Sequence, residues 1–379
     1  MDVILRFMHE IFYRKVRIDM LLMLKDIPLL KMNPDEYIFE VYRQDLLPYD
    51  LKDRFEHVIS QDLQYAWKIV HNIRSVQDFL SSRVLPLSRK NAKKIYNLLG
   101  NNQHDKLRVA FLCKGISLLD DYWVKLCSDQ ILWQDVSIRE NPLNEIFTQV
   151  ALRGSSLSLQ GSITTPETTT DGAYAKGWKR ENGRLYLYKK GYESHIEVMV
   201  SKLLDQLEIP HVSYEHAEDD GDYCCKCPCV TTDTASIVDA GVMEAWCNRT
   251  QKSFIHYVLS IDAEHFYQMC IVDYLISNPD RHSRNWGFCY DTDTTKLKGL
   301  HPLFDHNNSF DPAYMSNPDA DYIVLPGQTM RQAAKYAAKK INVTYKRPFT
   351  EQDFLTQRQY RSFMSRLNDL GIKQKDGSA

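Results

Sequence analysis

The segment that most constrains the fold of this chain is a polar loop between apolar stretches, with the sequence Asn278-Pro279-Asp280-Arg281-His282-Ser283-Arg284-Asn285-Trp286-Gly287. The stretch before it, residues 264–277, repeats apolar residues at helical spacing. Downstream, Leu303 and Phe304 form a short apolar run that ends in the carboxylate of Asp305. If these side chains act together, the fold must place Asp280, which follows a helix, close in space to Asp305.

The side chains of this loop form the set that phosphoryl transfer requires. One Asp accepts or orients the proton of the attacking hydroxyl, and an Asn and a second Asp hold magnesium on the nucleotide phosphates. The loop has the D-x-x-x-x-N spacing of a kinase catalytic loop, followed by a later metal-binding Asp. We therefore expect Asp280, Asn285 and Asp305 to be catalytic, and the last two to bind Mg²⁺. Taken singly, each piece has an ordinary alternative as a turn, a helix N-cap or a polar loop.

The segment around Lys189 supplies the cation that such a site needs. Residues 185–189 alternate with period two, so Lys189 lies on the inward face of a predicted strand. The helix predicted over 194–207 carries Glu197 in its first turn. A strand lysine followed by a helix with an early glutamate is the arrangement that pairs a phosphate-binding Lys with a Glu. The alternative is that Lys189 and Lys190 lie at a solvated strand end.

Length and composition favour a globular protein of several domains. The 379 residues exceed what one core usually holds, and we divide them into an accessory region (1–140), a small β-rich region (141–232) and a helical region (233–379). The 47 Lys and Arg nearly balance the 49 Asp and Glu, so no overall field favours nucleic acid or an anionic membrane. We see no signal peptide and no membrane span. The odd number of mostly isolated cysteines favours a reducing, cytoplasmic location.

Local patterns predict the elements of the first half of the chain. Residues 1–19 have an amphipathic helical pattern, and residues 20–49 alternate as strands. Helical spacing returns over 51–100, with Ser88 as an expected N-cap. From Ala151 onward we expect a strand, a loop and a second strand.

The loop predicted over 161–173 is rich in hydroxyl side chains, including Thr170. Its composition is suited to presenting backbone N–H groups to phosphate. In the second half, helical patterns recur over 330–337 and 351–370. The chain therefore passes from β-rich segments to a helical region.

Four cysteines within six residues admit two interpretations: Cys224, Cys225, Cys227 and Cys229. A zinc site would require adjacent thiolates to close a tetrahedron alone, without two separated C-x-x-C pairs. Alternation instead places three of these thiols on one face of a strand, where free Cys behaves as a small apolar residue. We predict the strand and no metal.

The loop and the later carboxylate together resemble the HipA-like serine/threonine kinases of bacterial toxin–antitoxin modules. The segments Asp280-Arg281-His282-x-x-Asn285 and Leu303-Phe304-Asp305 are similar to the catalytic and metal-binding pair of that family. Tyr188-Lys189 resembles its nucleotide lysine, and Asp171-Gly172-Ala173-Tyr174-Ala175-Lys176 resembles its phosphate loop. The resemblance covers about residues 145–320.

The resemblance implies a site for ATP and Mg²⁺ and a protein substrate. Besides Lys189 and Glu197, the implied nucleotide-binding residues are Thr170, Asp171, Gly172, Ala173 and Lys176, with His282 bracing the loop beside the nucleotide. It also implies self-phosphorylation and a separate DNA-binding antitoxin chain, so this chain is not expected to bind nucleic acid or a membrane. The chain departs from the family where Asp171 replaces a phosphorylatable serine, and His306-Asn307 replaces the Phe-Gly of a kinase switch.

The expected fold is α+β, a two-lobed protein-kinase-like fold with a small, mostly antiparallel β lobe and a helical C-terminal lobe after an N-terminal α/β accessory region. Two other functions remain open. The D-R-H-x-x-N order also occurs in lipid kinases of the phosphatidylinositol 3/4-kinase type, although the near-neutral charge argues against a membrane substrate. A nucleotide-binding pseudokinase acting as a regulatory module would have no need to retain Asp280, Asn285 and Asp305.

Overall fold

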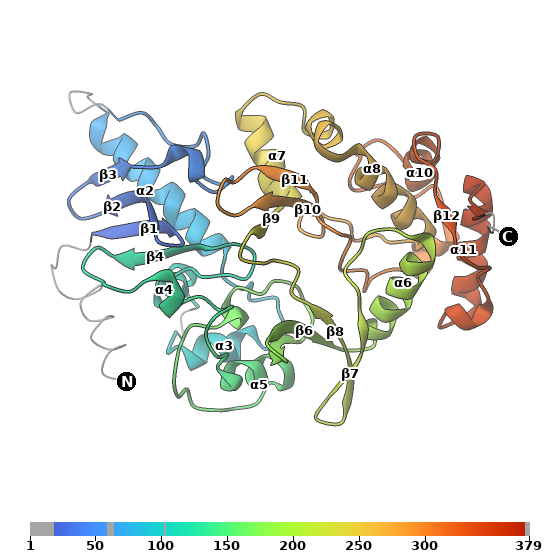
Figure 1. Cartoon of the computed structure of the whole chain (residues 1–379), viewed down its shortest axis with the longest axis horizontal. Coiled ribbons are helices and arrows are strands. Elements are labelled where there is room, and N and C mark those ends of the chain that lie inside the picture. The colour runs from blue at the N-terminus through green and yellow to red at the C-terminus, as the bar shows by residue number, and fades with distance from the viewer. Residues whose placement is uncertain (1–18, 59–63, 102–103, 376–379) are drawn as a thin grey trace. The chain divides into compact units, whose positions relative to one another are not determined.

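The computed structural model describes residues 19–58, 64–101 and 104–375, which form two compact units (Figure 1). Unit 1 contains the chain up to Leu185 and two returning segments, Thr231–Ser236 and Asp291–Lys296. Unit 2 contains Tyr186–Val230, Ile237–Tyr290 and the chain from Leu297 onward. The helix expected over 1–19 lies, apart from Asp19, outside the described residues. The division at residues 140 and 232 stays a prediction.

Unit 1 contains a four-stranded antiparallel sheet in the order β3-β2-β1-β4. Its strands are β1 (Met20–Leu24), β2 (Ile27–Asn33), β3 (Ile38–Val41) and β4 (Tyr122–Leu126). On the central strand, Leu22 pairs with Leu30 on one side and Val124 on the other, and all three are buried. The strands predicted between residues 20 and 49 are therefore confirmed.

The described part of unit 1 also contains helices, which are α2 (Tyr65–Ser82), α3 (Ala92–Leu98), α4 (Lys106–Leu112), α5 (Glu145–Arg153) and the short 3-10 helices η1 (Gln44–Leu46), η2 (Trp133–Asp135) and η3 (Pro166–Thr168). Strand β5 (Lys176–Glu181) follows η3. The helical spacing predicted over 51–100 is confirmed in part by α2 and α3, whereas residues 51–58 form turns and coil.

Two local predictions in unit 1 are wrong. Ser88 does not cap α3; the preceding residue is Asn91, held in the left-handed conformation (φ 66°) by a hydrogen bond from its side-chain amide to the Ala151 oxygen (3.0 Å). Ala151 itself lies in α5 and not in a strand. Asn144 caps that helix by accepting a hydrogen bond from the Ile146 N–H (3.1 Å), and Gly154 ends it with a φ of 66°.

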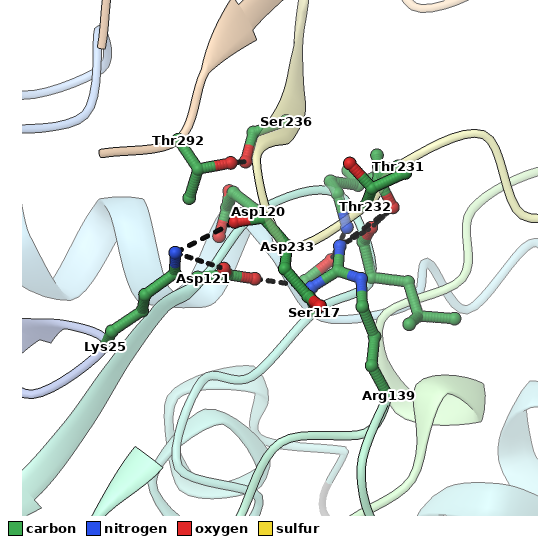
Figure 2. A network of polar contacts seen from close by, with 12 residues as sticks. Lys25, Ser117, Asp120, Asp121, Arg139, Thr231, Thr232, Asp233, Ser236 and Thr292 are labelled. Carbon is green, nitrogen blue, oxygen red and sulfur yellow. Dashed lines mark hydrogen bonds and ion pairs between the residues drawn. The ribbon is translucent and has the colours of Figure 1, made fainter. Parts of the chain in front are cut away.

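A polar network joins both returning segments to the rest of unit 1 (Figure 2). The Lys25 ammonium donates to the main-chain oxygen of Asp233 (2.8 Å) and to the carboxylate of Asp293 (2.6 Å). Ser236 and Thr292 share a buried hydroxyl–hydroxyl hydrogen bond of 2.8 Å, which links the two segments to each other. One lysine from the turn after β1 therefore holds both places where the chain returns to unit 1.

Unit 2 begins with an antiparallel sheet covered by a helix. Strand β6 (Arg184–Lys190) pairs with β8 (Asp222–Pro228), which pairs with β7 (Glu215–Asp219). Helix α6 (Glu193–Leu207) packs on this sheet, and its Val198 shares a buried cluster with Cys225 and Cys227. The strand and the helix predicted around Lys189 and Glu197 are confirmed.

The rest of unit 2 is mainly helical, with α7 (Ala240–Arg249), α8 (Phe254–Leu275), α9 (Pro312–Ser316), α10 (Met330–Ala338), α11 (Gln357–Leu370) and the 3-10 helix η4 (Glu351–Asp353). Strands β9 (Ala235–Asp239) and β10 (Gly287–Asp291) belong to unit 2 except for Ala235, Ser236 and Asp291, which lie in the returning segments of unit 1. The other strands are β11 (Leu297–Leu300), β12 (Thr344–Tyr345) and β13 (Lys373–Gln374). Helix α8 packs against α10 and α11. The mixed α+β content is confirmed, and the two-lobed arrangement stays a prediction.

Cys224, Cys225 and Cys227 lie in strand β8, as predicted, whereas Cys229 follows the end of that strand. Cys224, Cys225 and Cys227 are buried, and all nine cysteines are free thiols. Burial raises the pKa of Cys225 and of Cys227 to about 12, so both remain protonated near neutral pH. Among the described residues, no group of three or more His, Cys, Asp or Glu could hold a metal ion.

The purified protein should therefore contain no stoichiometric zinc, because protonated, buried thiols that pack against Val198 are not metal ligands. A chelator should leave its melting temperature unchanged, as measured by calorimetry. A Cys227→Ser variant serves as the control and should bind no less zinc than the wild type. The prediction would be wrong if elemental analysis found one zinc per chain in the wild type and none in that variant.

Candidate active site

Lys189 lies at the centre of a buried group of polar side chains in unit 2. Its Nζ contacts Glu197 Oε1 at 2.5 Å, Asp305 Oδ1 at 2.8 Å and Tyr214 Oη at 3.2 Å. Strand β6 carries the lysine, α6 carries the glutamate, and Asp305 follows β11. Glu197 is fully buried and Lys189 is 6% exposed, so solvent screens these contacts little. The structure thus brings together three residues predicted from separate parts of the sequence.

The charges in this group favour a further cation. Burial alone would lower the pKa of Lys189, but the carboxylates of Asp305 and Glu197 outweigh it and raise that pKa well above its ordinary value. Burial raises the pKa of Glu197, and Lys189 opposes that effect. With all three groups ionised, two carboxylates share one ammonium. The remaining negative charge would attract a cation beside Asp305.

Arg281 ties the Asp280 loop to the Asp305 segment. Its fully buried guanidinium pairs with Asp273 of α8, at 3.1 Å from Nε and 2.9 Å from Nη2. Its Nη1 donates to the main-chain oxygens of Asn285 (2.7 Å) and Phe304 (2.8 Å). Because one nitrogen holds both segments, Asn285 and the residue before Asp305 are neighbours in space.

His306 connects Arg281 with helix α6. The main-chain N–H of His306 donates to Glu197 Oε2 (2.9 Å), and the ring Nδ1 accepts a hydrogen bond from Arg281 Nη2 (3.1 Å). Burial, together with the charge of Arg281, holds the pKa of His306 well below its ordinary value, so the ring is neutral. Glu197 therefore contacts Lys189 with one carboxylate oxygen and the Asp305 segment with the other.

The Asp280 loop is closed by amide side chains. The Asp280 N–H donates to Asn278 Oδ1 (3.0 Å), and the Asp280 carbonyl accepts from Asn285 Nδ2 (2.8 Å). The Asp280 side chain is 36% exposed, and His282 Nε2 lies 3.9 Å from its Oδ1, too far for a hydrogen bond. The predicted acid–base residue is thus accessible, while the backbone of its loop is fixed.

Asn285 and Asp305 offer oxygen atoms of the kind that magnesium prefers. Asn285 uses its Nδ2 to close the loop, and within the described residues its Oδ1 accepts no hydrogen bond. Asp305 adopts the left-handed conformation (φ 56°), which aspartate tolerates better than most residues. Two protein oxygens suffice, since Mg²⁺ keeps waters and substrate phosphates as its other ligands. The residues present therefore fit the metal.

The predicted phosphate-loop residues belong to unit 1. Asp171 Oδ1 accepts a hydrogen bond from the Gly172 N–H (2.6 Å), and the Ala173 carbonyl accepts from the Lys90 N–H (2.8 Å). Lys176 is buried, and its Nζ lies so close to Gly172 that a Cβ there would be 2.1 Å away. Gly172 has a φ of 101°, a conformation that residues with side chains rarely adopt, so a substitution there would strain the backbone.

Arg89 braces this loop from within unit 1. Its buried guanidinium pairs with Glu167 Oε2 (3.0 Å) and donates to the main-chain oxygens of Glu167 (2.8 Å), Thr170 (3.0 Å) and Lys176 (2.5 Å). Thr170 is also fixed by its hydroxyl, which accepts from Trp178 Nε1 (2.9 Å). The loop is therefore held by a residue far upstream in the sequence.

Sequence reasoning missed the residues that support the site, chiefly Asp273, His306 and Arg89. Asp273 leaves a usable signal, because it is a lone carboxylate in the apolar run Cys270-Ile271-Val272-Asp273-Tyr274-Leu275. Buried charges are rare unless paired, so such a residue implies a partner. No local signal distinguishes Arg89 from neighbouring basic residues.

No protein-family model matches the chain, and no curated protein matches it. Among solved structures, the chain is similar to the Helicobacter pylori proinflammatory kinase CtkA, with a TM-score of 0.36 and 14% identity over 52% of this chain and 89% of that one. It is also similar to a chain of the Shewanella oneidensis MR-1 toxin–antitoxin complex of HipA, HipB and operator DNA, with a TM-score of 0.49 and 12% identity over 93% of this chain and 98% of that one.

A structural match to HipA thus accompanies the resemblance noted in the sequence. With identities of 12% and 14%, the chemistry rests on the side chains described above. In the part of the chain that the structure describes, no helix has the length and apolar character required to cross a membrane.

Proposed function

We propose that this chain is a HipA-like kinase that transfers the γ-phosphoryl group of ATP to a serine or threonine hydroxyl of a protein, with Mg²⁺. The observation that carries the proposal is the buried contact of Lys189 with both Glu197 and Asp305. Burying a lysine with two carboxylates carries a desolvation cost that the pairing repays only in part, and groups perturbed in this way cluster at functional sites.

Each residue then has a distinct task. Lys189 binds the nucleotide phosphates, and Glu197 keeps its ammonium in place. Asn285 Oδ1 and the Asp305 carboxylate hold the metal, and Asp280 orients the acceptor hydroxyl and accepts its proton. Bound Mg²⁺-ATP supplies the transferable phosphoryl group and a cation that offsets the phosphate charge.

The partners and the location follow from the same proposal. The acceptor is a protein, and a separate DNA-binding antitoxin chain is the expected partner, as HipB accompanies HipA in the Shewanella oneidensis complex. Nine free cysteines support a reducing compartment, and we propose the cytoplasm.

Calorimetric titration of the purified protein with ATP, with and without Mg²⁺, tests the proposal. The wild type should bind ATP in a magnesium-dependent manner, and Asp305→Asn should remove that dependence because the amide lacks the charge that attracts the cation. Asp35→Asn, a change at an exposed carboxylate of unit 1, is the matched control and should bind as the wild type does. Wild-type protein that binds no ATP in the presence of magnesium would reject the proposed function.

Self-phosphorylation, if it follows the family, should fall on the accessible hydroxyls of the 161–173 loop. Thr165 and Thr168 are buried, and Thr168 donates its hydroxyl hydrogen to the Thr165 carbonyl (3.1 Å). Ser162 is exposed. Mass spectrometry after incubation with Mg²⁺-ATP should find phosphate on Ser162 before Thr165 or Thr168, and a Ser162→Ala variant controls for the assignment. Early modification of either buried threonine would contradict this order.

A further inference from the structure

We propose that Asn308 is a positioning residue for Asp280, a role that rests on the proposed function. The Asn308 side-chain amide donates from Nδ2 to Asp280 Oδ2 at 2.7 Å. The two residues lie 28 positions apart in the sequence and belong to different loops. This contact fixes one oxygen of the carboxylate and leaves the other directed to an acceptor hydroxyl.

The two oxygens of the Asp280 carboxylate have different surroundings. Oδ2 accepts the hydrogen bond from Asn308, whereas Oδ1, within the described part of the chain, accepts none, and His282 Nε2 lies 3.9 Å from it. The His282 Nδ1 accepts a hydrogen bond from the Arg284 N–H (3.2 Å), which in the neutral ring leaves the proton on Nε2. The side chain is 36% exposed, and Oδ1 is the oxygen that still has its hydrogen-bonding capacity for a substrate hydroxyl.

The contact with Asn308 is not needed to hold the Asp280 loop together. The backbone N–H and carbonyl of Asp280 are already bonded to Asn278 and Asn285, at 3.0 and 2.8 Å. Arg281 anchors the same loop from the buried side. What Asn308 adds is control over the rotation of the carboxylate itself.

Asn308 is itself held in place on both sides. It lies in a turn in which the Ser309 N–H donates to the His306 carbonyl (3.0 Å). His306 is bound to Glu197, and the Phe310 N–H donates to the Ile276 carbonyl (2.7 Å) at the end of α8. Phe310 adopts a φ of 58°, a conformation that a bulky residue accepts only when its surroundings enforce it. The amide is therefore presented from a rigid turn.

The chemistry of the donor suits this role. An amide N–H fixes a carboxylate through a hydrogen bond without adding a charge, whereas a lysine or arginine would form an ion pair that competes with the acceptor. A small misplacement of a catalytic group can cost about 10²-fold in rate even when the group remains present. Asn308 thus sets the geometry of the proton acceptor and takes no part in nucleotide binding.

The test measures hydrolysis of Mg²⁺-ATP, with water as the acceptor, in wild type, Asn308→Ala and Asn308→Asp. Asn308→Ala should lower kcat about 10- to 100-fold with KM for ATP and the melting temperature unchanged. Asn308→Asp preserves the size and loses the donor, so it should lower kcat at least as much. Asn368→Ala, at an exposed position of α11, is the matched control and should leave kcat unchanged.

A double-mutant cycle separates positioning from general loosening of the site. If Asn308 acts only through Asp280, adding Asn308→Ala to Asp280→Ala should cause no further loss of kcat. Additive losses, or an Asn308→Asp variant with wild-type kcat, would overturn the proposal while the proposed function stands. A wild-type protein that neither binds nor hydrolyses Mg²⁺-ATP would reject the proposed function and this role with it.

Discussion

Asp280→Asn should reduce phosphoryl transfer by about 10²–10⁴-fold, the usual contribution of a positioned acid–base group. The amide retains the shape of the side chain and can still accept the hydrogen bond from Asn308, but it cannot take a proton from the acceptor hydroxyl. Mg²⁺-ATP affinity should be nearly unchanged, because the contacts assigned to the nucleotide belong to Lys189, Asn285 and Asp305. Single-turnover assays with labelled ATP and calorimetric titration measure the two quantities on the same preparation.

A control variant and the two measurements together distinguish a wrong role for Asp280 from a general effect of the substitution. Asp35→Asn should behave as the wild type in both measurements, since Asp35 is exposed. If Asp280→Asn kept wild-type turnover, the acid–base role assigned to Asp280 would be wrong. If it lost ATP affinity instead, Asp280 would belong to the nucleotide or metal contacts.

Arg281→Met should destabilise the protein by about 3–5 kcal/mol, the typical cost of removing one partner of a buried ion pair. Arg281 and Asp273 are both fully buried, and the guanidinium also satisfies the main-chain oxygens of Asn285 and Phe304. Methionine fills much of the volume, so the loss reflects charge and hydrogen bonds rather than a cavity. Urea unfolding, followed by fluorescence, gives the free energy of unfolding of the variant.

The matched control is Arg331→Met, which removes an arginine from a partly exposed pair with Asp369. Such surface pairs contribute about 0–1 kcal/mol, so this variant should remain close to the wild type. Combining Arg281→Met with Asp273→Leu should recover part of the stability, because no buried charge is then left unpaired. Equal stability of Arg281→Met and the wild type would show that Arg281 is not the anchor of the two loops.

The sequence alone could identify those parts of the site in which the signal is local. The alternation before Lys189 and the early Glu197 predicted β6 and α6, and the pair forms as expected. The contacts of Arg281 with the Phe304 carbonyl, and of Asn308 with Asp280, join distant segments and depend on how the chain folds back. No pattern of spacing encodes such a contact.

The two errors in local structure have different origins. Ser88 and Asn91 are comparable N-caps on intrinsic grounds, and a hydrogen bond from the Asn91 side chain to the Ala151 carbonyl holds Asn91 at the start of α3. Ala151 was expected in a strand because its apolar neighbours fit either period, and only the caps at Asn144 and Gly154 decide for the helix. The start of α3 therefore depends on a distant main-chain oxygen, whereas the bounds of α5 depend on local caps.

The buried contacts of Arg89 with the 167–176 segment limit how the N-terminal part of this protein could be removed or replaced. If another module replaced residues 1–140 and covered Glu167 without a cation, the buried carboxylate of Glu167 would have no countercharge, and the carbonyls of Thr170 and Lys176 would lose the donor that Arg89 provides. An unpaired buried carboxylate typically costs about 3–5 kcal/mol, a large share of the stability of most proteins. The first 140 residues are therefore not interchangeable with another N-terminal module unless the replacement supplies a cation at the same place.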